Sequence, residues 1–363
     1  MLTLGFETSC DETACAVVRD GRHVLSNAIA TQTELHEGYG GVVPEIAGRA
    51  HVERIIPVLR KALADAGVSA SEIDAVAVGH RPGLIGSLLV GVSAAKAAAL
   101  ALGVPLVGVD HVQAHLLAGT LDIDHDPPMP ALGLVVSGGH TAMYLVPSPI
   151  AAQRLGTTRD DAIGEAYDKA AAILGLPYPG GPRLDALAQH PLADPWAAQF
   201  PVSRLEDGSL DFSFSGLKTA VLYAVRGVPT RPGRSPSAPP PPPAPPPLTE
   251  ARVRDLAASF QRAACHAIML KLGRALEALA EGGIHCQSIL AGGGVTANSR
   301  LRKELAALAG ERSLELRLPK MEYCLDNAAM IAALGARRLM AGHADELTLR
   351  AHPSSDIPVY TVL

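Results

Sequence analysis

Aromatic residues are scarce in this sequence of 363 residues: they make up 4% of it, and one of them is tryptophan. Hydrophobic residues nevertheless account for 48% of the chain. A core with so few rings must be built mainly from aliphatic side chains and alanine. The length is sufficient for two domains with a large buried core.

Cysteine pairs are also lacking. The five cysteines are odd in number, and no two of them form a CxxC motif. The N-terminus has no basic region followed by a long apolar run. These absences predict a reduced, cytoplasmic protein without a signal peptide. The most apolar segment, residues 91–109, contains Lys96 and Pro105, so it predicts a buried helix running into a strand and not a membrane span.

The sequence has no excess of positive charge, since its formal net charge is −5. This excludes a protein that grips nucleic acid with its whole surface. A local basic patch, or a partner that supplies one, stays compatible with this charge.

Three familiar motifs are missing: the GK[ST] of a P-loop, the GxGxxG fingerprint and the HExxH of zinc proteases. A different glycine-rich turn is present in residues 288–305, SILAGGGVTANSRLRKEL, which predict a strand, a turn and a helix. The N-terminus of such a helix presents free N–H groups to a phosphate. Asn298 is either a ligand for the base or ribose of a nucleotide or the cap of this helix.

The order of the predicted elements indicates an α/β protein with an internal repeat. Residues 2–18 and 130–146 each read as a strand, a small polar turn and a second strand. They are either two ordinary hairpins or the openings of two duplicated domains with facing phosphate-binding turns. Residues 44–67 have the spacing of a long helix that ends at Gly67.

A proline-rich insertion interrupts this pattern at about residues 228–248, with eleven prolines between Pro229 and Pro247. Proline removes amide donors and favours an extended chain, so this segment cannot join a packed core. We predict a disordered, solvent-exposed spacer, with a docking site for an SH3-like partner as the alternative.

Two histidines, His111 and His115, lie four residues apart in an apolar run, so on a helix they share one face. This spacing allows both imidazoles to reach one metal ion, although such a pair can also be structural. Asp326 is the candidate third ligand, and His140 and Cys324 compete with it. Two histidines and an aspartate suit zinc or iron(II).

Nine segments, taken together and in this order, resemble the tRNA N6-adenosine threonylcarbamoyltransferase family, whose bacterial members are called TsaD and which was formerly labelled O-sialoglycoprotein endopeptidase. The resemblance extends from residue 3 to about residue 340. The segments are FETSCDETACAVV, EIAGRAH, PGLIGSLLVG, DHVQAHLLAG, LVVSGGHTAMYLV, TRDDAIGEAYDKAAAILGLPYPGGPRLD, FSFSGLKTAV, AGGGVTAN and YCLDNAAMIA.

The resemblance implies an actin-like fold of the sugar kinase and Hsp70 type, with two lobes built on duplicated ribonuclease H-like domains. It implies an N-terminal lobe of residues 1–128 plus about 326–363 and a C-terminal lobe of residues 129–325, which contains the insertion.

The resemblance also implies the site residues. His111, His115 and Asp326 would hold one divalent metal, iron(II) in the first place and zinc as the alternative. By analogy, Asp11 and Glu12 face the same cleft as catalytic candidates. The implied contacts to substrate come from Val135, Val136, Ser137, Gly138, Gly139, Asp168, Gly181, Asp185 and Asn298.

The implied reaction moves the threonylcarbamoyl group of threonylcarbamoyl-AMP to N6 of adenosine 37, in tRNAs that read codons beginning with A. The implied partners are tRNA, an inactive TsaB-type paralogue and a TsaE-type ATPase, with no membrane involved. A sugar or acetate kinase of the same superfold, a metalloendopeptidase and a non-catalytic scaffold are the alternatives. The histidine pair argues against the kinase and the scaffold, and the absent HExxH glutamate argues against the peptidase.

Two departures from the family pattern stand out. Arg81 replaces a glycine of the family's GPGL turn, and it would either change the turn or add a cation facing substrate or a partner. Leu325 and Ala328 depart from the pattern around Asp326, which itself is kept.

Overall fold

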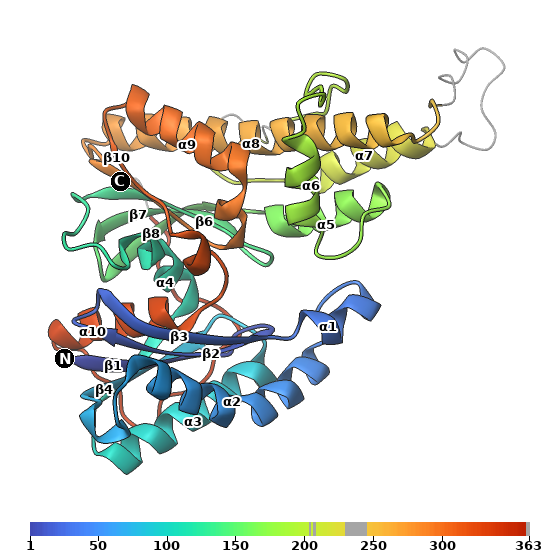
Figure 1. Cartoon of the computed structure of the whole chain (residues 1–363). Coiled ribbons are helices and arrows are strands. Elements are labelled where there is room, and N and C mark those ends of the chain that lie inside the picture. The colour runs from blue at the N-terminus through green and yellow to red at the C-terminus, as the bar shows by residue number, and fades with distance from the viewer. Residues whose placement is uncertain (203–204, 206–207, 229–244, 361–363) are drawn as a thin grey trace.

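The computed structural model describes residues 1–202, 205, 208–228 and 245–360, and it contains two five-stranded sheets. Most of the predicted proline-rich insertion, residues 229–244, lies outside the described residues. The two sheets lie one above the other in Figure 1, with helices on their outer faces and further helices between them.

The first sheet has the strand order β3-β2-β1-β4-β5. Helices α2 and α3 pack on one of its faces, where Ile55 and Val92 join the aliphatic core of β1 and β4. Helix α10 packs on the other face. The elements are β1 (Leu2–Glu7), β2 (Glu12–Arg19), β3 (His23–Thr31), α1 (Thr33–His36), α2 (Pro44–Ala66), β4 (Ala75–Arg81), α3 (Ile85–Leu102), β5 (Leu106–Asp110) and α10 (Ala328–Met340).

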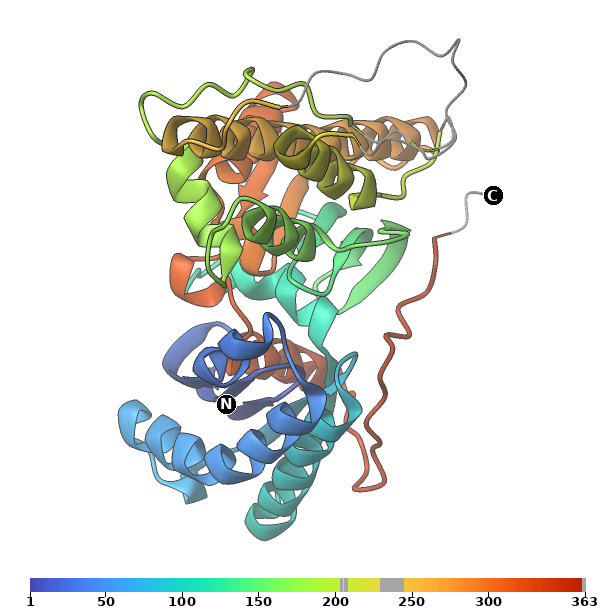
Figure 2. The ribbon, with the colours of Figure 1, turned by 90° about the vertical axis from the view of Figure 1, so that its right-hand side faces the viewer.

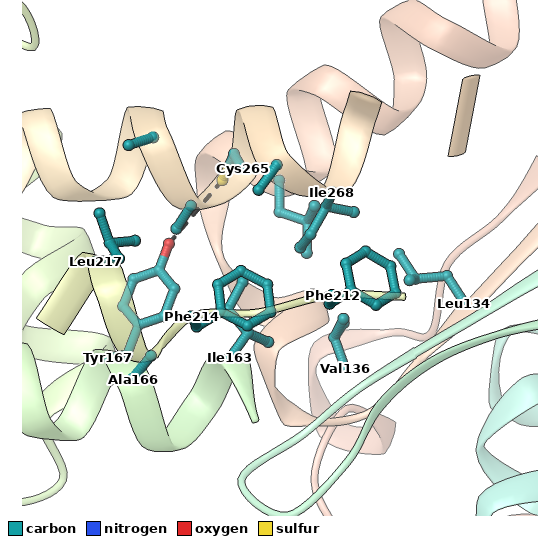
Figure 3. Packing of buried hydrophobic residues seen from close by; sticks show 14 of the residues in the cluster. Leu134, Val136, Ile163, Ala166, Tyr167, Phe212, Phe214, Leu217, Cys265 and Ile268 are labelled. Atoms are coloured by element: carbon teal, nitrogen blue, oxygen red, sulfur yellow. Dashed lines mark hydrogen bonds between the residues drawn. The ribbon is translucent and has the colours of Figure 1, made fainter. Parts of the chain in front are cut away.

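The second sheet has the order β10-β9-β6-β7-β8, and its outer face carries the larger helical layer. Figure 3 shows how Phe212 and Phe214 fill the space between β6 and the long helix α8, with their rings stacked 6.1 Å apart. The elements are β6 (Ala131–Val136), β7 (Thr141–Ser148), β8 (Ala151–Thr157), α5 (Ile163–Ile173), α6 (Gly180–Ala188), α7 (Ser215–Arg226), α8 (Glu250–Glu281), β9 (Ser288–Gly292), α9 (Ser299–Glu311) and β10 (Glu315–Arg317).

The internal repeat predicted from the sequence appears in both sheets. In the first, the antiparallel pair β1 and β2 is extended by β4, which runs parallel to β1. In the second, the antiparallel pair β6 and β7 is extended by β9, which runs parallel to β6. The two polar turns therefore occupy equivalent places in two duplicated units.

Helix α4 (His111–Leu117) lies between the two sheets, and all seven of its residues are buried. Ala114 and Leu117 pack on the first lobe beside Val109, whereas Val112 and Leu116 pack on the second beside Leu290. A helix that is apolar on opposite faces can be satisfied only between two layers. The apolar run around the two histidines is explained by this position.

The segment after α10 lies along both lobes, as Figure 2 shows. The Asp345 amide of this segment donates a hydrogen bond to the Leu106 carbonyl of β5. The Ser355 hydroxyl donates to Asp110 Oδ2 at 2.6 Å. Beyond these contacts, Tyr360 and Pro358 hydrogen-bond to Arg154 of β8 in the second sheet. This segment therefore contacts both sheets. The predicted residue bounds of the two lobes stay a prediction.

The structure shows a role for Arg81 that the sequence analysis did not predict. Its guanidinium forms an ion pair with Asp356 of the C-terminal segment. The added cation is thus balanced within the chain, and it ties β4 to that segment instead of standing open for a substrate.

Helix α3 is, by length and composition, the one helix among the described residues that could span a membrane, with a mean hydropathy of 1.8. In the fold it packs on α2 and on the first sheet, where Leu88, Val92 and Ala95 are buried. Its opposite face, which includes Leu89 and Leu100, is exposed.

The second sheet approaches the backbone of α4 closely at Gly292, the last residue of β9. A Cβ atom at this position would lie 1.9 Å from the carbonyl oxygen of His115. Because this neighbour is backbone, it cannot swing away, so the contact requires glycine.

We therefore expect Gly292→Ala to lower the free energy of unfolding by about 1–3 kcal/mol or more. Denaturant unfolding followed by circular dichroism measures this. Gly273→Ala, in the interior of α8 with open space around it, is the matched control and should raise stability by about 0.5–1 kcal/mol. Equal stability of the Gly292→Ala variant and the unmodified protein would contradict the close approach.

Candidate metal centre and nucleotide site

The candidate metal centre begins at the N-terminus of α4. Asp110 caps this helix, since its Oδ1 accepts hydrogen bonds from the backbone N–H groups of Val112 and Gln113 at 3.0 and 3.1 Å. The cap fixes the first turn of α4, which carries His111. As predicted, His111 and His115 lie one turn apart on a helix.

The structure brings His111, His115 and Asp326 together, and one ligand atom from each lies within 4.8 Å of the others. The Nε2 atoms of His111 and His115 are 3.4 and 3.1 Å from Asp326 Oδ1. Asp326 comes from the loop before α10, two residues ahead of the first residue of that helix. Two imidazole nitrogens and a carboxylate oxygen that converge on one point are suitable ligands for a divalent cation.

The charges of this cluster are strongly coupled. Burial alone would lower the pKa of His111, but the carboxylates of Asp326 and Glu7 raise it well above the usual value. Burial raises the pKa of Asp326, yet the His111 charge and bonds to both histidines hold it well below its usual range. His115 has its pKa lowered by burial and by the charge of His111. The opposite directions of these shifts favour an ion pair between a protonated His111 and an ionised Asp326 at the place where a cation would bind.

The two competing ligands lie outside this cluster. The Cys324 thiol contacts the Arg302 guanidinium at 3.3 Å and faces the carbonyls of Pro319 and Lys320. Burial, followed by the charges of the nearby His111 and His115, lowers the pKa of His140 to about 4. It is thus a neutral imidazole beside the centre.

Asp11 and Glu12, the predicted catalytic pair, lie where the turn after β1 leads into β2, and Glu12 is near enough to Asp326 for that carboxylate to affect its pKa. Burial, followed by the charges of Asp326 and Asp11, raises the pKa of Glu12 to about 10. Without a bound cation Glu12 therefore holds its proton at neutral pH. Positive charge in the cluster would favour its ionised form.

Glu7 contacts the candidate metal centre, and the sequence analysis did not single it out. It is fully buried at the end of β1, and its Oε2 lies 3.0 Å from His111 Nδ1. The available signal was a lone acidic residue at the end of the otherwise uncharged strand LTLGFE. Buried carboxylates need a partner, and the sequence alone does not identify that partner.

The turn after β6 contains the predicted contacts Val135 to Gly139. The side chains of Val135 and Val136 are buried in the core, so these two residues offer only backbone atoms. The Ser137 amide donates to the His140 carbonyl, and the His140 amide donates to Ser137 Oγ. Among the described residues we find no acceptor for the amides of Gly138 and Gly139, which are exposed. These two N–H groups are the ones available to an anion.

Two more predicted residues, Asp168 and Gly181, contact each other. Asp168 Oδ1 accepts hydrogen bonds from the amides of Gly180 and Gly181, at 2.8 and 3.3 Å. This carboxylate thus shapes the turn that begins α6.

Asp185 and Asn298 also meet, although they are far apart in the sequence. Asn298 Nδ2 donates to Asp185 Oδ1 at 3.2 Å and to Gln261 Oε1 at 3.0 Å. Asn298 Oδ1 accepts from the Leu301 amide, so the residue caps α9 as well. Both interpretations of Asn298 are therefore compatible with its geometry. Gln261, on the buried face of α8, gave no signal in the sequence.

The glycine-rich turn lies between the candidate metal centre and the hydrogen-bonded pair of Asp185 and Asn298. Between β9 and α9 it forms a short 3-10 helix, Gly294–Ala297. Gly293 has a φ of +94°, and a Cβ there would lie 2.4 Å from the Val136 carbonyl oxygen. Leu325, the departure next to Asp326, is exposed and lies against Gly294. The metal cluster, the turn after β6 and the turn before α9 are thus neighbours.

Comparison with known proteins assigns the chain to a family. A sequence model described as TsaD, tRNA N6-adenosine threonylcarbamoyltransferase, matches residues 23–333. The protein of this name from Trichlorobacter lovleyi is 50% identical over 351 residues, which cover 97% of this chain and 95% of the relative. The protein of the same name from Pelobacter propionicus is 48% identical over 350 residues, which cover 96% of this chain and 95% of the relative.

Solved structures are similar in fold. The HypF protein of T. kodakarensis matches 96% of this chain and 49% of its own, with a TM-score of 0.58 at 16% identity. The activator of the 2-hydroxyisocaproyl-CoA dehydratase from Clostridium difficile matches 95% of this chain and 99% of its own, with a TM-score of 0.50 at 13% identity. These likenesses concern the fold alone and confirm the actin-like, two-lobed class.

Identity near one half over almost the whole length, together with a family model that spans most of the chain, leaves one assignment. The chain belongs to the tRNA N6-adenosine threonylcarbamoyltransferase family.

Proposed function

We propose that this chain transfers the threonylcarbamoyl group of threonylcarbamoyl-AMP to N6 of adenosine 37 in tRNAs that read codons beginning with A. The observation that carries the proposal is the cluster of His111, His115 and Asp326 beside a glycine-rich turn. A kinase of the same fold has no need of such a cluster. The names of the relatives agree with a transferase and not with a peptidase.

The reaction needs positioning more than strong acid or base chemistry. Its donor is a mixed anhydride with AMP as a good leaving group, and its acceptor is a weakly nucleophilic amine. The free amides of Gly138 and Gly139 are suited to bind the developing negative charge. Asp185 and Asn298 are suited to hold the ribose of the donor. Orientation of the two substrates then supplies most of the acceleration.

A divalent metal held by His111, His115 and Asp326 would supply Lewis acidity toward the phosphate or carbonyl oxygens of the donor. We propose iron(II), with zinc as the alternative that the same donor set accepts. Glu12 is near enough to Asp326 for that carboxylate to affect its pKa, and Asp11 is the neighbour of Glu12 in the chain. Their proposed task is to receive or orient the protons of the acceptor amine once the cation favours the ionised form of Glu12.

The central test is transfer by the purified chain. We expect His111→Ala to reduce the formation of modified adenosine by about 100-fold or more, the order seen when groups that stabilise a transition-state charge are removed. The assay combines the chain and its biosynthetic partners with unmodified tRNA, threonine, bicarbonate and ATP, and it reads nucleosides by mass spectrometry.

His343→Ala, an exposed histidine of the C-terminal segment, is the matched control and should leave transfer unchanged. Modification that survives His111→Ala would keep the enzyme and remove the proposed role of the histidines. No modification with either protein, while a related enzyme works in the same mixture, would refute the proposed reaction.

Metal binding should depend on pH. The raised pKa of His111 means that a cation displaces a proton from the centre at neutral pH. The apparent affinity for Zn²⁺ should therefore rise between about pH 6 and about pH 8, by about tenfold per pH unit for each proton displaced. Competition with a chelator measures this affinity at each pH. His115→Ala is the control, because it removes one of the proposed ligands and should weaken Zn²⁺ binding. An affinity that is independent of pH would contradict the protonated state of His111.

We also propose that the chain acts with tRNA, a TsaB-type paralogue and a TsaE-type ATPase in the cytoplasm. Exposed apolar side chains on two adjacent helices support a protein partner: Val52 and Ile56 of α2, and Ile85 and Leu89 of α3. Gly48 and Gly86 bring the two helices together beside them. Exposed apolar surface of this kind is typical of interaction sites.

We expect Leu89→Asp to weaken the complex with the paralogue by about tenfold or more, because it places a charge in the apolar contact. Analytical ultracentrifugation of the mixed proteins measures this. Leu192→Asp, which changes a more exposed leucine in the second lobe, is the control and should bind normally. Loss of binding in the control alone would move the interface to the other lobe.

A further inference from the structure

Glu7 is placed to control how His111 presents its ring. Glu7 Oε2 lies 3.0 Å from His111 Nδ1, on the opposite side of the imidazole from the Nε2 that faces Asp326. Both side chains are almost fully buried. An imidazole with a proton on Nδ1 has its lone pair on Nε2, where a metal can bind.

The carboxylate of Glu7 is itself held on both oxygens. Its Oε1 accepts the backbone N–H of Ser9 at 2.5 Å, while Oε2 faces the imidazole. Gly79 of β4 makes room for it, since a Cβ there would lie 2.6 Å from Oε2. Two neighbouring strands of the first sheet thus fix this carboxylate against α4.

A second group near the ring is the Ser9 hydroxyl, whose Oγ lies 3.2 Å from His111 Nδ1. A hydroxyl can donate or accept, so it selects neither tautomer. A carboxylate can only accept, and it therefore requires a proton on Nδ1. His115 has no such partner, since its Nδ1 is buried without a hydrogen bond among the described residues.

We propose that Glu7 is a positioning residue for the metal centre: it keeps the proton of His111 on Nδ1 and aims Nε2 at the cation. The inference rests on the proposed metal-binding role of His111, His115 and Asp326. Glu7 does not touch substrate or cation in this account. It acts through His111, as carboxylates behind metal-bound histidines do.

Glu7→Gln is the sharpest variant, because its shape is nearly the same. Glutamine has one acceptor oxygen where Glu7 uses two. With that oxygen toward the Ser9 amide, the NH₂ group faces His111 Nδ1 and favours a proton on Nε2, which blocks the metal. With the oxygen toward His111, the Ser9 amide loses its acceptor. Either arrangement should weaken metal binding by about 10- to 100-fold.

The measurement is the affinity of the purified full chain for Zn²⁺, by chelator competition, beside the thermal stability of the metal-free proteins. Asp122→Asn is the matched control: this carboxylate also accepts a backbone amide and side-chain donors, but lies elsewhere in the first lobe. It should leave Zn²⁺ affinity unchanged. Ser9→Ala should have a smaller effect than Glu7→Gln.

Long-range ¹H–¹⁵N spectra of histidine-labelled, Zn²⁺-loaded protein give a second readout that requires no variant to fold. We expect a slowly exchanging proton on His111 Nδ1. Coordination of zinc through Nδ1, or no such proton, would overturn the proposal.

The outcomes separate the two claims. If the unmodified protein binds Zn²⁺ and Glu7→Gln binds it equally well, the role of Glu7 is rejected and the metal centre stands. If the unmodified protein binds Zn²⁺ no better than His115→Ala does, the metal centre is rejected and the role of Glu7 with it. Weaker binding by a Glu7→Gln protein of normal stability, with the Nδ1 proton present in the unmodified protein, supports the proposal.

Discussion

The burial of α4 between two sheets is the constraint on which the site depends. A helix that packs on both lobes cannot turn or slide without opening one of them, so its side chains have a fixed direction. The two polar residues on this helix that face the centre, His111 and His115, are therefore held in register with Asp326, which enters from the loop before α10. The precision of the centre comes from apolar packing on either side of it.

This packing also explains why small residues surround the site. The second sheet reaches α4 through Gly292, and the turn after β6 reaches the glycine-rich turn through Gly293. Backbone meets backbone at both places: a side chain at Gly292 would push the second sheet away from α4, and one at Gly293 would push the two turns of the second sheet apart. The scarcity of aromatic residues in the sequence agrees with this close packing, since alanine and aliphatic residues make up most of the layers around α4, with Tyr144 as the aromatic member.

Much of the fold and part of the candidate site could be predicted from the sequence, because the sequence patterns that indicate them are local. The strand–turn–strand repeat, the helix that ends at Gly67 and the four-residue spacing of His111 and His115 each depend on neighbours in the chain. Three features could not be predicted, because each depends on a contact between distant segments. They are the position of Glu7 beside His111, that of Gln261 beside Asn298, and the pairing of Arg81 with Asp356. The double role of Asn298 needed the fold as well: its capping is local, whereas its bond to Asp185 spans two helices.

The balance of charge inside the centre gives the strongest physical reason to regard it as built for a cation. Glu7, Glu12 and Asp326 converge there with a single strongly basic imidazole, in surroundings that disfavour unpaired charge. In the absence of a cation the cluster avoids this repulsion by keeping a proton on Glu12 and one on His111. A purely structural histidine pair would need neither the second carboxylate behind His111 nor the third beside Asp326. A divalent ion would replace those protons and leave every carboxylate ionised, which is the state in which Glu7 can orient a ligand and Glu12 can accept a proton.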